Sequence, residues 1–223
     1  MRLLALDTAT EACSAALMLD GAISERYEVI GRGHADRLLP MADELLRAAG
    51  ITVRELDAIA FGRGPGGFTG LRIAAAVAQG LAVGAGLPVL PVSDLAALAL
   101  AGARASGCRR ILACMDARMG QLYWAAYEVQ GDRAAAASPE ALSAPAAVRA
   151  PSAGPWYGAG HGFAARPELV AKFGDALIGL DASLLPRASD IATLAAGEFR
   201  AGSALPAARA QPVYLRDEVV HKR

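Results

Sequence analysis

The sequence predicts an α/β fold made of two similar halves. An apolar strand at Leu3–Leu6 ends in Asp7 and is followed by a tight polar turn and a return strand. The same order occurs again at Ile111–Met115, which ends in Asp116. Helical patterns separate the two strand groups, and a repeated order of elements within one chain indicates duplication. We therefore expect two related α/β units.

The first half is predicted as a strand meander followed by alternating helices and strands. Asp20-Gly21 is a strong signal for a two-residue hairpin turn. The expected strands are Leu3–Leu6, Ser14–Leu19, Ala22–Val29, Leu56–Phe61 and Val89–Val92. Three helices are expected. The first begins at His34 and ends before Gly50, and the second runs from Thr69 to Ala85. The third begins at a Ser93-Asp94 cap and ends at about Ala105, before Gly107.

The second half is predicted to start a new unit at Arg110. Its expected elements are strands at Ile111–Met115 and Gln121–Val129, a strand end at Tyr157–Gly162, helices at Glu168–Phe173 and Ser189–Ala201, and an extended piece at Gln211–Leu215. The stretch between 131 and 155 is rich in Ala, Ser and Pro, so we expect loop or short helix there. These boundaries divide the chain into a lobe at 1–106 and a lobe at 107–223. The last segment of the second lobe could pack back on the first lobe.

Composition excludes several classes of protein. The chain has 223 residues, 54% of them hydrophobic, with 22 basic and 22 acidic side chains. A protein that holds nucleic acid alone should be clearly basic, so the zero net charge argues against that role. Three cysteines without a CxxC pair fit a reducing cytoplasm, and three scattered histidines give no metal-ligand spacing. We expect no metal site, no leader and no membrane span, because the longest uncharged run, between Arg72 and Asp94, is broken by glycine and proline.

The turn after the first strand carries the first candidate site. The carboxylate of Asp7 could hold a metal-bound water, and the hydroxyls of Thr8 and Thr10 could face a phosphate. The alternative is a turn in which these side chains satisfy their own backbone, which is the commoner use of such residues. Asp116 occupies the corresponding place in the second half.

A glycine-rich segment from residue 62 to residue 70 carries the second candidate site. Backbone N–H groups at Gly64, Gly66 and Gly67 could approach an anion beside a helix N-terminus. A tight structural turn is an equally good interpretation. A Rossmann site is disfavoured because Pro65 removes a donor and no acidic residue follows at the required distance.

The helix at 69–85 has almost no polar face. Ala76, Gly80 and Gly84 recur every four residues and form a smooth ridge that a second helix could approach closely. A helix without a polar face is buried in its own core or against a partner. We expect partial burial by another subunit.

His34 is expected as an exposed residue at a helix start, and His161, between glycines, as a loop residue.

Four segments together resemble the TsaB (YeaZ) family over nearly the whole chain. They are Leu4–Thr10, Gly62–Ile73, Met115–Gly120 and Pro212–Arg216. The resemblance implies an actin/Hsp70/sugar-kinase-like (ASKHA) fold with two duplicated lobes, in which mixed sheets are flanked by helices. It also implies a non-catalytic relative of TsaD, with no catalytic residue, metal or cofactor of its own.

The resemblance implies that the chain is a subunit needed to form N6-threonylcarbamoyladenosine at adenosine-37 of tRNAs that read codons beginning with A. TsaD transfers the threonylcarbamoyl group from threonylcarbamoyl-AMP, and the ATPase TsaE joins the complex. The implied state is a cytoplasmic heterodimer with TsaD, or a homodimer when the chain is alone, that contacts tRNA indirectly. The helices at about 35–49 and 69–85 would form the interface through Leu38, Met41, Leu45, Leu71, Ile73, Ala76, Val77, Gly80 and Gly84.

Two other functions stay open from the sequence. One is an active nucleotide-dependent phosphotransferase of the same fold, with Asp7 and Asp116 on either side of a cleft. The other is a stand-alone peptidase, which the absence of a metal-ligand pair and of a catalytic triad disfavours. If the chain touches tRNA itself, we expect a local contact through Arg109, Arg110, Arg118 or the basic tail at 221–223.

Overall fold

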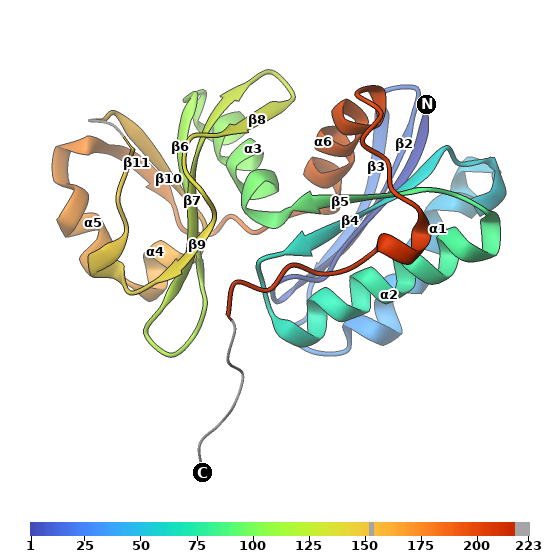
Figure 1. The fold of residues 1–223 in the computed structure, drawn as a ribbon, viewed down its shortest axis with the longest axis horizontal. Coiled ribbons are helices and arrows are strands. Elements are labelled where there is room, and N and C mark those ends of the chain that lie inside the picture. Colours follow the sequence, from blue (N-terminus) through green and yellow to red (C-terminus); the bar gives the residue numbers. More distant parts are fainter. Residues whose placement is uncertain (152–153, 217–223) are drawn as a thin grey trace, which may run out of the picture.

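The computed structural model describes residues 1–151 and 154–216 and contains two mixed sheets with helices between and outside them (Figure 1). The first sheet has the order β3-β2-β1-β4-β5. Its strands are β1 (Arg2–Asp7), β2 (Ala12–Leu19), β3 (Ala22–Val29), β4 (Ala58–Gly64) and β5 (Val89–Ser93). The second sheet has the order β11-β10-β6-β7-β8, and β9 also pairs with β7. Its strands are β6 (Arg110–Asp116), β7 (Leu122–Gln130), β8 (Arg133–Ala136), β9 (Ala141–Ser143), β10 (Trp156–Ala159) and β11 (Leu177–Asp181).

The predicted duplication is confirmed by the topology of the two sheets. In the first sheet β1, β2 and β3 form an antiparallel meander, and β4 lies parallel to β1. In the second sheet β6, β7 and β8 repeat this meander, and β10 lies parallel to β6. Asp7 and Asp116 are therefore the last residues of equivalent strands.

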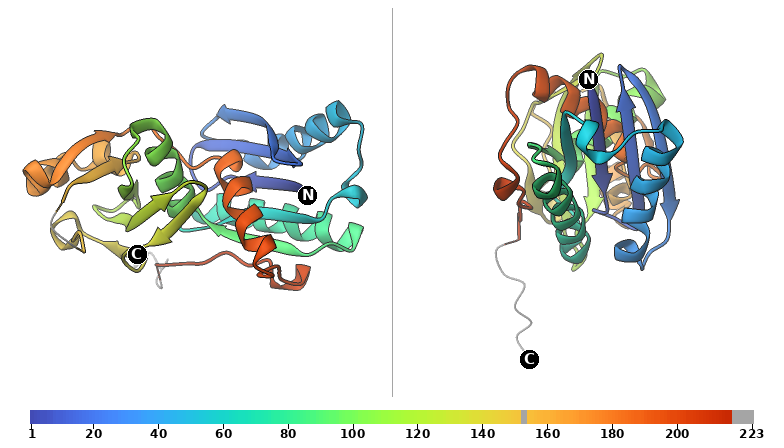
Figure 2. Two further views of the ribbon diagram at one scale, coloured as in Figure 1. Left: turned by 90° about the horizontal axis from the view of Figure 1, so that it is seen from above. Right: turned by 90° about the vertical axis from the view of Figure 1, so that its right-hand side faces the viewer.

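Six α-helices are present in the part of the chain that the structure describes. They are α1 (His34–Ala49), α2 (Phe68–Ala85), α3 (Asp94–Ser106), α4 (Gly162–Ala165), α5 (Glu168–Phe173) and α6 (Ala188–Arg200). Helices α1 and α2 cover the outer face of the first sheet and α6 covers its inner face, whereas α3 packs on the second sheet (Figures 1 and 2). We call the first sheet with α1, α2 and α6 the first lobe, and the second sheet with α3, α4 and α5 the second lobe.

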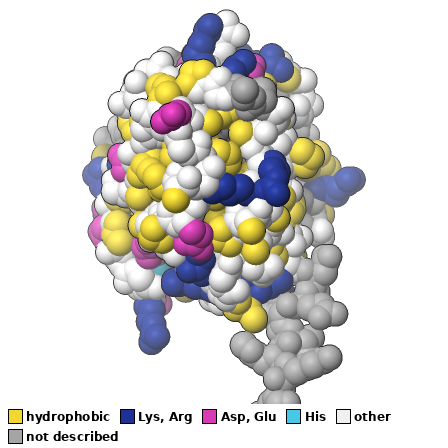
Figure 3. All heavy atoms as spheres, turned by 90° about the vertical axis from the view of Figure 1, so that its left-hand side faces the viewer, with side chains coloured by type: hydrophobic (Ala, Val, Ile, Leu, Met, Phe, Trp, Pro, Cys, Tyr) yellow, Lys and Arg dark blue, Asp and Glu magenta, His cyan; other side chains and the backbone are white. Residues whose placement is uncertain are grey.

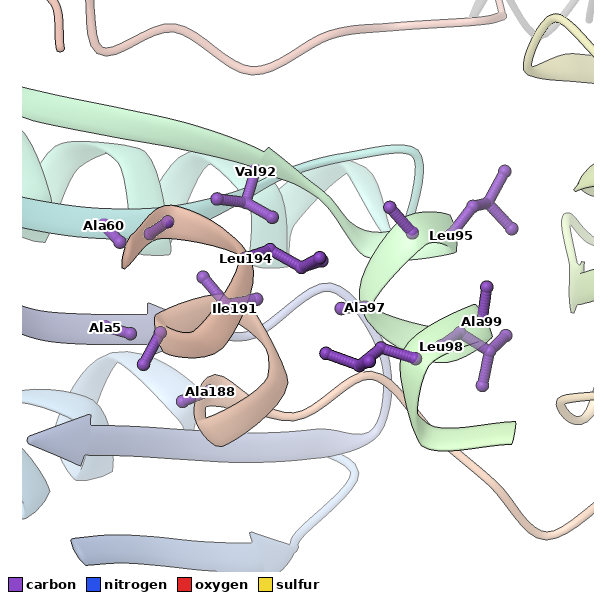
Figure 4. Packing of buried hydrophobic residues seen from close by; sticks show 14 of the residues in the cluster. Ala5, Ala60, Val92, Leu95, Ala97, Leu98, Ala99, Ala188, Ile191 and Leu194 are labelled. Atoms are coloured by element: carbon purple, nitrogen blue, oxygen red, sulfur yellow. The ribbon is translucent and has the colours of Figure 1, made fainter. Parts of the chain in front are cut away.

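A hydrophobic core runs from one lobe into the other. Figure 4 shows Ile191 and Leu194 of α6 packed between the first sheet and α3, with Leu98 on the facing side of α3. All three side chains are buried. Because apolar burial contributes about 25 cal/mol per Å², this shared layer stabilises one arrangement of the two lobes.

Several local signals in the sequence are confirmed by the backbone. Asp20 and Gly21 both have positive φ, at 49° and 93°, in the turn between β2 and β3. Gly50 ends α1 in the left-handed conformation. The Ser93 hydroxyl accepts a hydrogen bond from the N–H of Ala96 at 3.1 Å and so caps α3 as expected.

Three expectations about elements were wrong. The segment expected as loop or short helix contains the strands β8 and β9, and β11 was not foreseen. These strands are only three to five residues long and contain no fully buried residue, so they leave a weak pattern in the sequence. Strand β4 continues to Gly64 rather than ending at Phe61, since Gly62 and Gly64 still pair with β5. The extended piece expected at Gln211–Leu215 belongs to no regular strand, and its Val213 N–H donates to the Arg63 carbonyl at 2.7 Å. The tail at 221–223 lies outside the described residues.

Candidate functional site

A cavity of about 810 Å³ opens where the ends of β1 and β6 face each other across the two lobes. Its first wall is formed by the turn after β1, the start of α1 and the glycine-rich turn before α2. Its second wall is formed by the turn after β6 and by His161, and the C-terminal segment 213–216 runs along the rim. Polar groups from both halves thus converge on one concave site, as expected for equivalent strand ends in a duplicated fold.

Asp7 lies behind the wall of this cavity rather than on its surface. Its side chain is fully buried, and Oδ1 accepts a hydrogen bond from the N–H of Ala9 at 2.8 Å. The buried carboxyl of Asp94 lies beside it, and Asp94 in turn accepts the N–H of Gly64. Burial raises the pKa of Asp7 to about 6 and raises the pKa of Asp94 well above its usual range. Neither Asp7 nor Gly64 lines the cavity, so both were wrong as phosphate-facing candidates.

The turn residues Thr8 and Thr10 line the cavity, but their hydroxyls bind the protein's own backbone. Thr8 Oγ1 donates to the carbonyl of Gly70 at 2.6 Å. Thr10 Oγ1 accepts the N–H of Ala12 at 3.2 Å. Together with the Asp7–Ala9 hydrogen bond, these contacts support the interpretation of this segment as a self-satisfied turn.

Two glycines of the glycine-rich segment, one before α2 and one in its first turn, are required by close backbone contact. A Cβ atom at Gly70 would lie 1.9 Å from the carbonyl oxygen of Thr8, and one at Gly66 would lie 2.6 Å from that of Ala9. Gly67 donates its N–H to the Ala9 carbonyl at 2.7 Å. Gly66 and Gly67 line the cavity, but the tight approach of the two turns already explains why glycine is needed at 66 and 70.

The opposite wall centres on Asp116, which lines the cavity. Its Oδ1 accepts the N–H of Arg118 at 3.1 Å, and the Arg166 guanidinium lies 3.7 Å away. The backbone N–H of Asp116 donates to Nε2 of His161 at 3.3 Å. His161 therefore carries its proton on Nδ1 when neutral, and burial lowers its pKa. His161 lies in the turn between β10 and α4, as expected of a loop residue, and directly precedes α4.

His34 differs from the prediction. It is buried rather than exposed, and its Nε2 lies 3.0 Å from the carbonyl oxygen of Thr10. The helix cap is Gly33. Across residues 1–151 and 154–216, no group of three or more His, Cys, Asp or Glu side chains is arranged to hold a metal ion.

Sequence reasoning missed the polar contacts that join the lobes. Arg63 donates two hydrogen bonds of 3.1 Å to Glu140, which also accepts the Ser93 and Tyr127 hydroxyls. Arg216 donates to the Ala117 carbonyl at 2.9 Å. No local motif marks such pairs, because their partners are far apart in the sequence. Asp94 was noticed only as part of a helix cap.

The residues predicted for the partner surface differ in burial, and only some of them are accessible to a partner. Leu38, Met41 and Leu45 are buried in the core of the first lobe, and Leu71 is buried at the cavity wall, so all four were wrong as contact residues. The side chains of the three α1 residues face the sheet because apolar helix positions at this spacing form the inward stripe. Ile73 and Val77 are half-buried, whereas Ala76, Gly80 and Gly84 are exposed on α2.

From Ala76 to Ala85 the exposed side of α2 carries no charged residue and is open. A Cβ at Gly80 or Gly84 would meet no atom within 4 Å. By length and composition alone α2 could also cross a membrane, but the core helices of many proteins meet the same criterion. In this fold its buried side packs on β4 and β1.

Comparisons with known proteins give one consistent result. Residues 27–219 match the family model described as "TsaD: tRNA N6-adenosine threonylcarbamoyltransferase". The chain is 41% identical over its full length to the tRNA threonylcarbamoyladenosine biosynthesis protein TsaB of Escherichia coli, covering 98% of that protein. It is 38% identical to the protein of the same name from Haemophilus influenzae, again over its full length and over 97% of that protein.

A solved structure gives the same answer. YeaZ from Pseudomonas aeruginosa is 48% identical and superposes with a TM-score of 0.90, covering 96% of this chain and 99% of that one. The two-lobed arrangement of mixed sheets and flanking helices agrees with the predicted ASKHA-like fold. With matches of this length in sequence and structure, the chain belongs to the TsaD family and, within it, to the proteins named TsaB or YeaZ.

Proposed function

We propose that this chain is a non-catalytic subunit in the formation of threonylcarbamoyladenosine on tRNA, which binds a TsaD-type transferase through the exposed side of α2. A role in tRNA threonylcarbamoyladenosine biosynthesis follows from its full-length relatives, which carry that name. In the proposed complex TsaD performs the transfer, TsaE joins the pair, and a second copy of this chain occupies the same face when TsaD is absent.

The observation that carries the proposal is the surface formed by Ala76, Gly80 and Gly84. These positions are exposed, uncharged and open to approach. Small residues at this spacing let a second helix come close, so that many backbone and Cβ atoms make contact. Exposed apolar surface of this kind is typical of a protein–protein interface.

The position of Asp7 supports a non-catalytic role. A phosphotransferase that used Asp7 would need this carboxyl to face a metal-bound phosphate in the cavity. Here it is fully buried, accepts the N–H of Ala9 and lies beside the carboxyl of Asp94. The residue that the phosphotransferase alternative requires therefore serves to hold the turn together.

The interface is tested with one substitution and a matched control. Gly80→Glu places a charge on the open side of α2 without a clash, and Gly197→Glu places the same charge on the exposed side of α6, where a Cβ also meets no atom within 4 Å. On gel filtration with purified TsaD, we expect Gly80→Glu to elute separately and Gly197→Glu to co-elute. Co-elution of Gly80→Glu with TsaD would contradict the proposed interface.

A further inference from the structure

Four large apolar side chains that are more than a third exposed gather on the rim of the cavity. They are Phe68, Met119, Val213 and Tyr214. They come from three separate segments of the chain, namely the start of α2, the turn after β6 and the C-terminal segment. A concentration of exposed apolar groups at one place indicates an interaction surface.

Two of these side chains form a stack with Arg72. The rings of Phe68 and Tyr214 have centroids 5.4 Å apart, and the Arg72 guanidinium carbon lies 3.7 Å from the Phe68 centroid. Arg72 Nε donates to the Tyr214 hydroxyl at 2.9 Å. The stack of Phe68, Arg72 and Tyr214 is therefore held in place before any ligand binds, which lowers the entropy cost of binding.

The charge around the stack is positive. Arg32, Arg118 and Arg216 line the cavity beside it, and Arg118 is almost fully exposed. Among the described residues that line the cavity, the acidic ones are Glu11 and Asp116. Asp116 is mostly buried and faces Arg118 and Arg166. The first turn of α2 carries no acidic residue. By contrast, basic side chains on the outer end of the second lobe are scattered among apolar and acidic ones (Figure 3).

We infer that this rim binds an unpaired loop of RNA, with a nucleobase stacked against Phe68, Arg72 and Tyr214 and the neighbouring arginines facing phosphates. Unstacked bases are recognised by aromatic rings and by the planes of arginine side chains. A protein partner would favour a rim depleted in charge, such as the side of α2 around Gly80. The choice of RNA as the ligand rests on the proposed role in tRNA modification.

This assignment revises which arginines face tRNA. Arg118 stands on the rim, as considered from the sequence. Arg110 lies at the other end of β6, where it pairs with Glu128 and lies over the Trp156 ring. Arg109 directly precedes that end of the strand. The stack itself carries no sequence motif beyond the glycine-rich turn.

The test measures fluorescence anisotropy of a labelled, unmodified anticodon stem-loop RNA with the full chain at low salt. Phe68→Leu keeps an apolar side chain but removes the ring, and Arg72→Ala removes the guanidinium plane. We expect each to weaken binding about ten-fold or more, whereas Phe68→Trp retains binding. Arg47→Ala, an exposed arginine on α1, is the matched control and should bind as wild type. A fully paired RNA of the same length should compete poorly.

The inference is overturned if wild type shows no saturable binding, if the paired RNA competes equally, or if Phe68→Leu binds as tightly as Phe68→Trp. Tyr214→Leu serves as a second ring-deleted variant should Phe68→Leu fold poorly. Phe68→Leu and Tyr214→Leu should co-elute with TsaD, since both rings lie at the cavity rim, away from Gly80. Loss of co-elution with unchanged RNA binding would assign the rim to a protein partner instead. RNA binding is measured without TsaD, so its failure is distinct from failure of the proposed subunit role.

Discussion

Asp7 and Asp94 form a buried carboxyl pair beneath the turns that build one wall of the cavity. Both side chains are fully buried, and each holds a backbone N–H group, Asp7 that of Ala9 and Asp94 that of Gly64. Burial is the largest cause of the raised pKa of Asp94, and the charge of Asp7 raises it further. Two adjacent buried carboxyls ionise together only at a high free-energy cost, so the pair keeps one proton at moderate pH.

The pair makes stability depend on pH in a definite direction. The folded-state pKa of Asp7 is about 6, above its unfolded value. Its stabilising contribution to the free energy of unfolding is therefore fully present below about pH 4 and is lost as pH rises through 6. Asp94→Asn keeps an oxygen for the N–H of Gly64 and offers an N–H to Asp7. We expect a smaller loss of unfolding free energy between pH 5 and pH 8 than in wild type, measured by urea denaturation. An unchanged loss, equal to that of the exposed control Asp43→Asn, would contradict this account.

Two glycines of α2 should respond in opposite directions to alanine. Gly70→Ala forces a Cβ against the Thr8 carbonyl, so we expect the unfolding free energy to fall by about 3 kcal/mol. Gly80→Ala meets no atom and removes unfolded-state entropy, so we expect a gain of about 0.5–1 kcal/mol. Urea denaturation of both variants checks the difference. Equal effects would show that the turns do not approach as closely as described.

At the scale of elements, α3 and α6 join the two lobes through a partly buried ion pair. Arg104 of α3 donates to Asp190 Oδ1 of α6 at 2.6 Å and to the Thr193 hydroxyl at 3.2 Å. Burial raises the pKa of Asp190 to about 6 even though Arg104 lowers it. The carboxylate is therefore ionised at neutral pH mainly in the presence of its partner.

Arg104→Ala should weaken the contact between these helices. We expect the unfolding free energy to fall by about 2 kcal/mol at pH 7.5, less than for a fully buried pair because Arg104 is half exposed. The loss should be smaller at pH 5, where Asp190 is protonated. Arg47→Ala, which breaks an exposed pair with Asp43, should change stability by less than about 0.5 kcal/mol. A pH-independent loss for Arg104→Ala would argue against a role of the charge.

The elements that the sequence predicted well are those with strong local signals. The Asp20-Gly21 turn, the helix end at Gly50 and the helix cap at Ser93 each require a particular residue type, so the sequence predicts where these elements begin or end. The edge strands β8, β9 and β11 depend on pairing with β7 and β10 instead. Tertiary pairing of this kind leaves little trace in a short, alanine-rich segment.

At the scale of the whole molecule, the repeated order of strands brought Asp7 and Asp116 to facing strand ends, as the sequence predicted. Which side chains enter the cavity could not be predicted, because Asp7 turns toward Asp94 and is fully buried behind the cavity wall. The glycine-rich turn indicated a close approach but not its partner, which is the turn at Thr8 and Ala9.

Contacts between the lobes give the molecule a defined interlobe geometry. The shared core of α3 and α6, the Arg63–Glu140 pair and the Arg216 contact all cross from one lobe to the other. The cavity, the exposed side of α2 and the stack at Phe68 thus keep fixed positions relative to each other. This arrangement suits the proposed role, in which the exposed side of α2 binds a protein partner and the cavity rim binds RNA.

The most direct measurement of the central claim is reconstitution of the modification reaction. Purified TsaD and TsaE are combined with unmodified tRNA and threonylcarbamoyl-AMP, and threonylcarbamoyladenosine is measured by mass spectrometry of the nucleosides. We expect full yield with the wild-type chain or Gly197→Glu, and a yield near background without the chain or with Gly80→Glu. Equal modification in the absence of the chain would contradict its role as a required subunit.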